Sequence, residues 1–240
     1  MSFTGIPVIY GISPHATSTT PLHQLGSYGV TSDGRGYRYA QAGAAGCAAG
    51  LIQMATDITA NHEDLAVNTF AVGDREITVT LGATAITGNE YEEGFVNITD
   101  GTGQGILYKI AKCPATALST DVVITLAEPI VVGAEAATTV TLVRNKYRDI
   151  LATDGTEGDL PVGVPNVAIA ADYYGWVQTK GYCSILVGAG DTTAGADITI
   201  DTTTAGGAET RATVERTVGV QPAGAGADVG EYGVFELTLD

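Results

Sequence analysis

The chain carries little positive charge. Its 240 residues include 11 lysines and arginines against 27 aspartates and glutamates, which gives a formal net charge of −16 at pH 7. Charged residues make up 16% of the chain, below the roughly 25% of an average protein. Nucleic acid and anionic lipid repel a chain this acidic, so we expect neither as a partner.

Cysteines and long apolar runs are scarce as well. Cys47, Cys113 and Cys183 are far apart in the sequence and form no C-x-x-C pair, which predicts buried free thiols rather than a disulfide framework or a zinc site. The uncharged stretch at residues 39–56 is rich in Ala and Gly and contains two glutamines, so no membrane span is predicted. No cationic residue precedes the first apolar run, so we expect no signal peptide and synthesis in a cytoplasm.

Patterns typical of a catalytic or ligand-holding site are also missing. The GTGQG segment at residues 101–105 lies between two predicted strands, whereas a phosphate-binding loop is followed by a helix, so we predict a hairpin turn there. Residues 188–191 and 224–228 contain Gly and Asp, but calcium-binding repeats need several consecutive copies. His15 and His23 have no acidic neighbour in the sequence. We therefore expect no enzyme, no bound metal and no cofactor.

Short runs of Val, Ile and Thr, separated by Gly or Asp-Gly, are what the chain has in abundance. They recur at roughly the 8–12-residue spacing that is typical of all-β domains, and the 32 glycines fall largely between them. Alternation of apolar and polar side chains buries one face of a strand and exposes the other. The best-defined predicted strands are Ile77–Leu81, Phe95–Thr99, Ile106–Ile110, Asp121–Leu126, Thr139–Val143, Asp197–Ile200 and Val234–Leu239.

The N-terminal part is less regular. Residues 1–25 are rich in Pro, Ser, Thr and Gly and lack periodicity, which predicts an extended arm. A hairpin follows, with Tyr28–Val30 and Arg35–Tyr39 on either side of an Asp-Gly turn. In residues 40–54 three glycines would cost a helix about 3 kcal/mol, so turns that lead into a strand at Leu51–Met54 are favoured.

Aromatic residues are densest in Tyr173–Gln178, the segment that contains the one Trp of the chain. We predict a strand over Tyr173–Thr179 and a further one over Tyr182–Val187. Alternation places Tyr174, Trp176 and Gln178 on one face of the first strand. Three interpretations stay open: Trp176 fills the core of the β domain, it anchors an interface, where Tyr and Trp often dominate the binding energy, or it stacks on a carbohydrate.

Several segments together resemble a known family. They are TSDGRGYRYAQAGAAGCAAGLIQ (residues 31–53), PNVAIAADYYGWVQTKGYCSILV (165–187), AGADITIDTTTAGGAE (194–209) and VGVQPAGAGADVGEYGVFELTL (218–239). They look like the head decoration, or cement, proteins of tailed bacteriophages. The resemblance implies an all-β fold: a small β-barrel or β-tulip-like domain formed from both chain ends, interrupted by an inserted domain that is sandwich-like or barrel-like.

The expected domain organisation follows from this resemblance. Residues 1–25 would form the arm, residues 26–62 and 150–240 the capsid-binding domain, and residues 63–149 an inserted, outward-facing β domain. The acidic, Gly- and Pro-containing segment at residues 152–163 is expected to be a linker or crossing loop.

The resemblance also implies a function. The chain would be a structural virion protein that binds the outer surface of a tailed-phage capsid through its major capsid protein and stabilises the shell, as a homotrimer. An alternative is a head-fibre or tail adhesin module that binds host glycans through exposed aromatics such as Tyr91 or Trp176. The expected capsid or oligomer contacts are Arg35, Tyr37, Arg38, Tyr39, Arg144, Lys146, Arg148, Tyr174 and Trp176.

Overall fold

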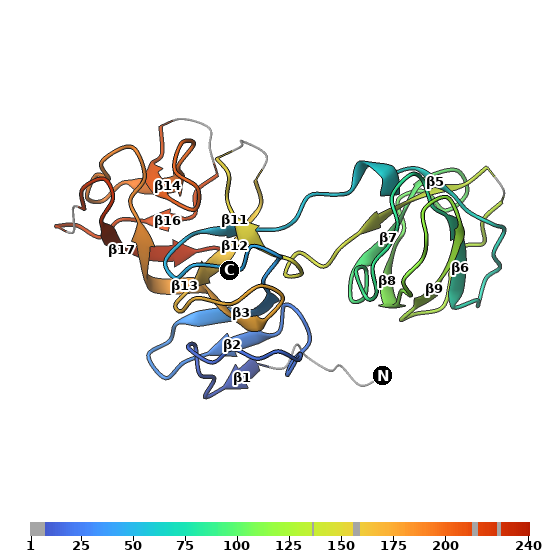
Figure 1. Cartoon of the computed structure of the whole chain (residues 1–240), viewed down its shortest axis with the longest axis horizontal. Coiled ribbons are helices and arrows are strands. Elements are labelled where there is room, and N and C mark those ends of the chain that lie inside the picture. The colour runs from blue at the N-terminus through green and yellow to red at the C-terminus, as the bar shows by residue number, and fades with distance from the viewer. Residues whose placement is uncertain (1–7, 136, 156–158, 213–215, 225–226) are drawn as a thin grey trace. The chain divides into compact units, whose positions relative to one another are not determined.

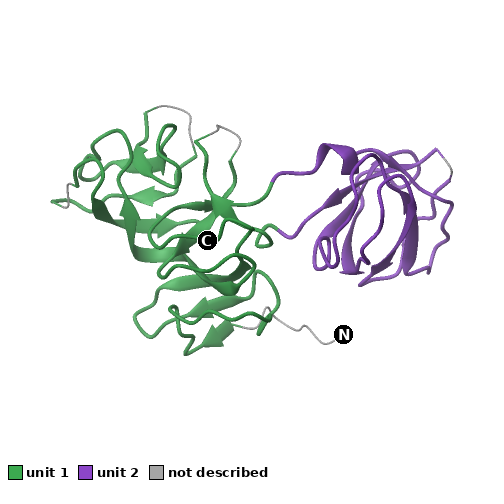
Figure 2. Ribbon diagram, viewed as in Figure 1, with its two compact units in different colours: residues 1–56, 146–240 green, residues 57–145 purple. Residues whose placement is uncertain are grey.

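The computed structural model describes all residues except 1–7, 136, 156–158, 213–215 and 225–226. The chain divides into two compact units (Figure 2). Unit 1 comprises residues 1–56 and 146–240, and unit 2 comprises residues 57–145. The predicted all-β chain, with one domain built from both ends around an inserted β domain, is confirmed. The structure divides at 56/57 and 145/146 rather than at 62/63 and 149/150.

Unit 2 is a nearly closed antiparallel barrel. Its strands follow the order β5-β10-β7-β8-β9-β6, and a bridge between Val67 and Val79 links the two outer strands. The elements are η1 (a 3-10 turn, Ala60–His62), β5 (Leu65–Ala66), β6 (Glu76–Thr80), β7 (Phe95–Asp100), β8 (Leu107–Lys112), β9 (Asp121–Leu126) and β10 (Thr139–Val143). The GTGQG segment forms the turn between β7 and β8, as predicted.

The interior of unit 2 follows the predicted alternation. Along β6, Ile77 and Val79 are buried, and their polar neighbours face outward. His62 is also buried: its Nε2 donates to the carbonyl of Thr84 at 3.1 Å, so its Nδ1 accepts from the Tyr91 hydroxyl at 2.6 Å. Two buried polar side chains are thereby paired within the apolar core.

Unit 1 is organised around one large sheet (Figure 1). Its main path runs β1-β2-β3-β13-β17-β16-β14-β15, and β4, β11 and β12 branch from it. The strands are β1 (Val8–Tyr10), β2 (Tyr28–Val30), β3 (Gly36–Gln41), β4 (Gln53–Met54), β11 (Leu151–Ala152), β12 (Pro161–Pro165), β13 (Tyr174–Leu186), β14 (Asp197–Ile200), β15 (Ala208–Thr210), β16 (Gly219–Val220) and β17 (Tyr232–Thr238).

Strand β13, of 13 residues, is the central element of unit 1. Its first half pairs with β3 and β12, and its second half pairs with β17. The sequence predicted two strands here, separated near Gly181. The structure has one, because Gly181 adopts a φ of +84° and the pairing with β3 shifts register between Gln178 and Lys180. A glycine inside a strand marks a bulge as often as an end.

Two apolar clusters fill unit 1, one on each half of β13. The cluster against β3 contains Tyr37, Tyr39 and Trp176, and the cluster against β17 contains Ile185 and Phe235. All three cysteines of the chain are free and buried, as the sequence predicted. Burial raises the pKa of each thiol to about 12.

The N-terminal segment differs from the extended arm that was predicted. From Val8 onward the described residues fold onto unit 1: β1 pairs in parallel with β2, and Ser18 forms a bridge with Tyr174. The backbone N–H of Leu22 donates to the Tyr39 hydroxyl at 3.1 Å. Residues 1–7 of the predicted arm lie outside the described residues. Aperiodic sequence is typical of such segments, because loops that wrap a sheet satisfy their polar groups irregularly.

Trp176 lies inside unit 1 and is 4% exposed. Its ring lies 5.2 Å from the ring centroid of Tyr39 and 5.3 Å from that of His23. The side chain also packs directly over Gly29 of β2, where an added Cβ would come within 2.8 Å of the indole. The interpretation of Trp176 as a core residue therefore agrees with the structure.

We expect the substitution Trp176→Ala to lower the stability of unit 1 by about 3–5 kcal/mol, because it opens a large cavity in an aromatic cluster. Hydrogen–deuterium exchange of the β3 and β13 amides measures the effect, with the amides of unit 2 as an internal reference. The control is Tyr173→Ala, which removes an exposed ring beside the same strand and should change stability by less than about 0.5 kcal/mol. Equal effects of the two substitutions would contradict the assignment.

Candidate binding surfaces of unit 1

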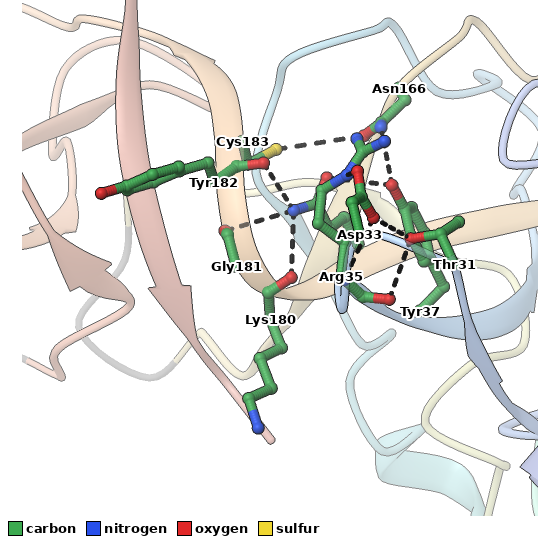
Figure 3. A network of polar contacts seen from close by, with 10 residues as sticks. Thr31, Asp33, Arg35, Tyr37, Asn166, Lys180, Gly181, Tyr182 and Cys183 are labelled. Carbon is green, nitrogen blue, oxygen red and sulfur yellow. Dashed lines mark hydrogen bonds and ion pairs between the residues drawn. The ribbon is translucent and has the colours of Figure 1, made fainter.

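A buried polar network fixes the bend of β13 (Figure 3). Gln178 is fully buried, and its Nε2 contacts the carbonyl oxygens of Lys180, Gly181 and Tyr182 at 3.0, 3.2 and 2.8 Å. The Tyr37 hydroxyl donates to Gln178 Oε1 at 3.3 Å. The same hydroxyl accepts from Asn166 Nδ2 at 3.1 Å. These bonds hold the backbone at Tyr182 in one position, because the amide is satisfied in this geometry.

The β2–β3 hairpin turn lies beside this network. Asp33 Oδ1 accepts from the Thr31 hydroxyl at 2.5 Å, and Asp33 Oδ2 accepts from Arg35 Nε at 2.7 Å. The hydrogen bond from Thr31, followed by that from Arg35, lowers the pKa of Asp33 to about 2. The positive charge of Arg35 is therefore balanced within its own turn.

A cleft of about 400 Å³ opens next to this turn, and we name it the two-tyrosine cleft. Tyr182 of β13 and Tyr232 of β17 are 59% and 56% exposed. The residues that line the cleft are His15, Arg35, Ala49, Gly50, Pro165, Asn166, Gln178, Tyr182, Cys183, Ser184 and Tyr232. The cleft thus combines aromatic rings with amide, hydroxyl and guanidinium groups, and its volume lies within the range of small-ligand sites.

The register of β13 against β17 sets the spacing of the two tyrosines. Tyr182 stands opposite Glu236, and Tyr232 stands opposite Leu186. The Cα atoms of the two tyrosines are therefore offset by four positions along the paired strands, which is about 13 Å. Figure 3 shows the Tyr182 ring directed away from the buried network. Both rings thus belong to the outer face of the sheet.

A second surface lies at the edge of the sheet, at its first strand. Val8 and Tyr10 of β1 are 39% and 79% exposed. A groove of about 560 Å³ runs beside them, lined by Tyr10, Gly11, Ile12, Val30, Thr31, Ser32 and Gly34. Among the described residues, β1 pairs with one strand, β2. We name this region the edge-strand surface.

Three of the expected contact residues lie in the interior instead. Tyr37, Tyr39 and Trp176 are 0%, 2% and 4% exposed, so their side chains present almost no surface to a partner. Tyr174 is half-buried and stacks on Tyr39 with ring centroids 6.1 Å apart. Tyr91, the other aromatic expected in the adhesin alternative, is fully buried in unit 2. An aromatic run in an alternating strand faces the core when the opposite strand supplies further rings.

The expected cationic contacts do not form one cluster on one unit. Arg144 belongs to unit 2 and pairs with Glu90, whereas Lys146 and Arg148 belong to unit 1. Arg148 Nη1 donates to Gln41 Oε1 at 3.0 Å, and Lys146 is exposed with its Nζ 4.9 Å from the Tyr147 ring centroid.

Arg38 forms an ion pair in which its guanidinium contacts both carboxylate oxygens of Asp240. Its Nη2 lies 2.9 Å from Asp240 Oδ1, and the guanidinium lies 4.7 Å from the ring centroid of Tyr28. The Thr179 hydroxyl donates to Asp240 Oδ2 at 2.5 Å. Partial burial raises the pKa of Asp240, but the hydrogen bonds from Arg38 and Thr179 outweigh it and hold this pKa below its ordinary value of 3.8.

Sequence reasoning missed Tyr182, Tyr232, Val8 and Tyr10 as surface residues. The sequences of β13 and β17 could have revealed part of this surface, because both strands carry apolar side chains on both faces. Ile185 and Phe235 face inward, while Tyr182, Tyr232 and Val234 face outward. An apolar side chain on the water-facing side of a half-buried strand indicates a binding surface.

The described residues contain no group of three or more His, Cys, Asp or Glu side chains that could hold a metal ion. In the same part of the chain, no helix has the length and apolar character needed to cross a bilayer.

Comparison of the whole chain with protein-family models, with curated proteins and with solved structures finds no match in any of the three.

We expect Asp240→Asn to destabilise unit 1 by about 1–2 kcal/mol at neutral pH, because it removes a charged partner of Arg38. A carboxylate whose pKa is lower in the folded state than in the unfolded state stabilises the fold above its unfolded pKa. That contribution is lost as the pH falls below 3.8 and through the lower, folded-state pKa. Urea unfolding of the wild type and the variant should therefore show that the difference between their free energies of unfolding shrinks as the pH is lowered through this range. Asp191→Asn, at an exposed carboxylate, is the control, and a difference that grows on acidification would refute the assignment.

Proposed function

We propose that this chain is a structural virion protein that binds the outer surface of a tailed-phage capsid and stabilises the shell. The family resemblance of residues 31–53 and 165–239 supports this proposal. So does the architecture, in which two β units each contain their own apolar core. Rigid sheets that present fixed side chains lose little entropy on binding, which suits a protein that reinforces a large assembly.

The edge-strand surface is the observation that carries the proposal. An outermost strand offers backbone N–H and C=O groups to an added strand, and natural proteins usually protect such edges with charge, Pro or a covering loop. Val8 and Tyr10 of β1 instead expose apolar side chains, and an apolar groove adjoins them. An extended segment of the major capsid protein fits this surface: its backbone would extend the sheet beside β1, and its side chains would enter the groove.

The charge of the chain is compatible with this role. A net charge of −16 favours solubility of the free protein before it meets its partner. Arg35 and Arg38 have intramolecular partners, so we assign capsid affinity mainly to apolar and backbone contacts rather than to cations. Unit 2, an insert with its own core, would be carried on the capsid-bound unit 1.

We expect the double substitution Val8→Lys/Tyr10→Ser to weaken capsid binding at least tenfold. The lysine places a charge on the edge strand, and the serine removes the exposed ring that borders the groove. Occupancy is measured by densitometry and electron cryo-microscopy of capsids that lack the protein, after addition of the purified chain. The control is Val123→Lys, at an exposed position of β9 in unit 2, which should leave occupancy unchanged. Full occupancy with the double variant would refute the edge-strand assignment.

We also expect the protein to form a trimer, as the family resemblance implies. Size-exclusion chromatography coupled to light scattering should give three times the chain mass of 24.5 kDa. The double variant Val8→Lys/Tyr10→Ser should keep this mass, since the proposal assigns these residues to the capsid rather than to the oligomer. A monomer throughout the concentration range would contradict the expected oligomer while leaving the occupancy test to decide capsid binding.

A further inference from the structure

We infer that the two-tyrosine cleft of unit 1 binds a neutral oligosaccharide. The inference rests on the geometry of the cleft and does not depend on the capsid proposal, which concerns the edge-strand surface.

The two tyrosines supply the apolar contacts. A pyranose ring has a flat face of C–H groups that stacks on an aromatic side chain, and a tyrosine adds a hydroxyl that reaches the sugar oxygens. Tyr182 and Tyr232 both line the cleft and are 59% and 56% exposed. Their Cα atoms are offset by about 13 Å along the paired strands, which is longer than one sugar, so a ligand that contacts both side chains is assigned more than one sugar unit.

The aromatic contacts are largely preorganised. Tyr232 lies directly over Gly50, where an added Cβ would come within 2.6 Å of the ring. Gly50 has a φ of +72°, which favours glycine, and its carbonyl accepts from the N–H of Leu186 at 2.9 Å. At the other end, Gln178 Nε2, within hydrogen-bond distance of three backbone carbonyls, holds the backbone at Tyr182. A ring packed on Gly50 and a fixed backbone beneath the second ring reduce the freedom that is lost when a ligand stacks.

The polar lining matches a ligand rich in hydroxyl groups. Asn166 presents an amide oxygen, which accepts, and Ser184 is exposed with a hydroxyl that donates and accepts. Arg35 contributes a guanidinium whose charge is balanced by Asp33. Ala49 and Gly50 complete the lining with small residues.

Other ligand classes fit the cleft less well. An anionic ligand would meet a protein of net charge −16 and an arginine that is already paired. A purely apolar ligand would leave the amide, hydroxyl and guanidinium groups without hydrogen-bond partners. A peptide that added as a strand at Leu186 would find this N–H already bonded to Gly50. A neutral sugar satisfies both the rings and the polar lining.

The test is binding of three neutral trisaccharides, maltotriose, cellotriose and triacetylchitotriose, measured by saturation-transfer NMR and calorimetry with the full chain. We expect at least one to bind with a Kd near or below about 1 mM. Tyr182→Ala should weaken that binding at least about tenfold, because it removes a stacking platform. Since Tyr182 is exposed, the variant should retain the fold, which amide exchange of β13 verifies.

The matched control is Tyr10→Ala, which removes an even more exposed tyrosine ring outside the cleft and should leave sugar binding unchanged. Lack of binding by all three sugars would overturn the inference, as would equal losses in the two variants or tighter binding of the anionic sugar sialyllactose. Capsid binding separates the two proposals. The Tyr182→Ala variant should occupy the capsid fully, whereas the Val8→Lys/Tyr10→Ser variant should bind the capsid weakly and bind the sugar with unchanged affinity.

Discussion

Unit 1 depends on the pairing of β13 with its neighbours over its full length. The first half of this strand places Trp176 and Gln178 opposite Tyr39 and Tyr37 of β3, and the second half places Cys183 opposite Phe235 of β17. Two apolar clusters are thereby joined by one continuous backbone. The bend between them is fixed by a buried amide rather than by apolar packing, because Gln178 Nε2 lies within hydrogen-bond distance of three successive carbonyl oxygens. Replacement of Gln178 by an apolar residue would remove these bonds and would also leave the Tyr37 hydroxyl without its acceptor on Gln178.

Much of the fold was predictable because an alternating strand determines its own buried face. The strands at Asp121–Leu126, Thr139–Val143 and Asp197–Ile200 occur with the predicted bounds. The Asp-Gly hairpin between β2 and β3 and the absence of a helix at residues 40–54 also follow from local turn chemistry. The division into an outer unit and an insert came from a family resemblance, since alternation within single strands does not reveal which distant strands pair.

The surfaces were harder to predict than the fold. Contacts with the capsid or with other subunits were predicted for three aromatic residues, Tyr37, Tyr39 and Trp176. Each is buried, because its cross-strand partner supplies a matching ring or amide. Tyr182 and Tyr232 are chemically similar and lie outside, because their positions in the alternation place Cys183 and Gly233 on the inner face. The sequence alone shows which residues of a strand share a face. It does not show which of the two faces packs against the core. That choice depends on register, which is a property of two strands together.

The burial of all three thiols makes this chain convenient for site-specific chemistry. Since a thiolate is the reactive species and burial holds each pKa near 12, maleimide reagents should leave the native cysteines untouched under mild conditions. A cysteine introduced at exposed Ser184 would then be the one accessible handle on the molecule. A fluorophore attached there would lie in the cleft and report on ligand binding directly, and none of the three native cysteines would have to be replaced.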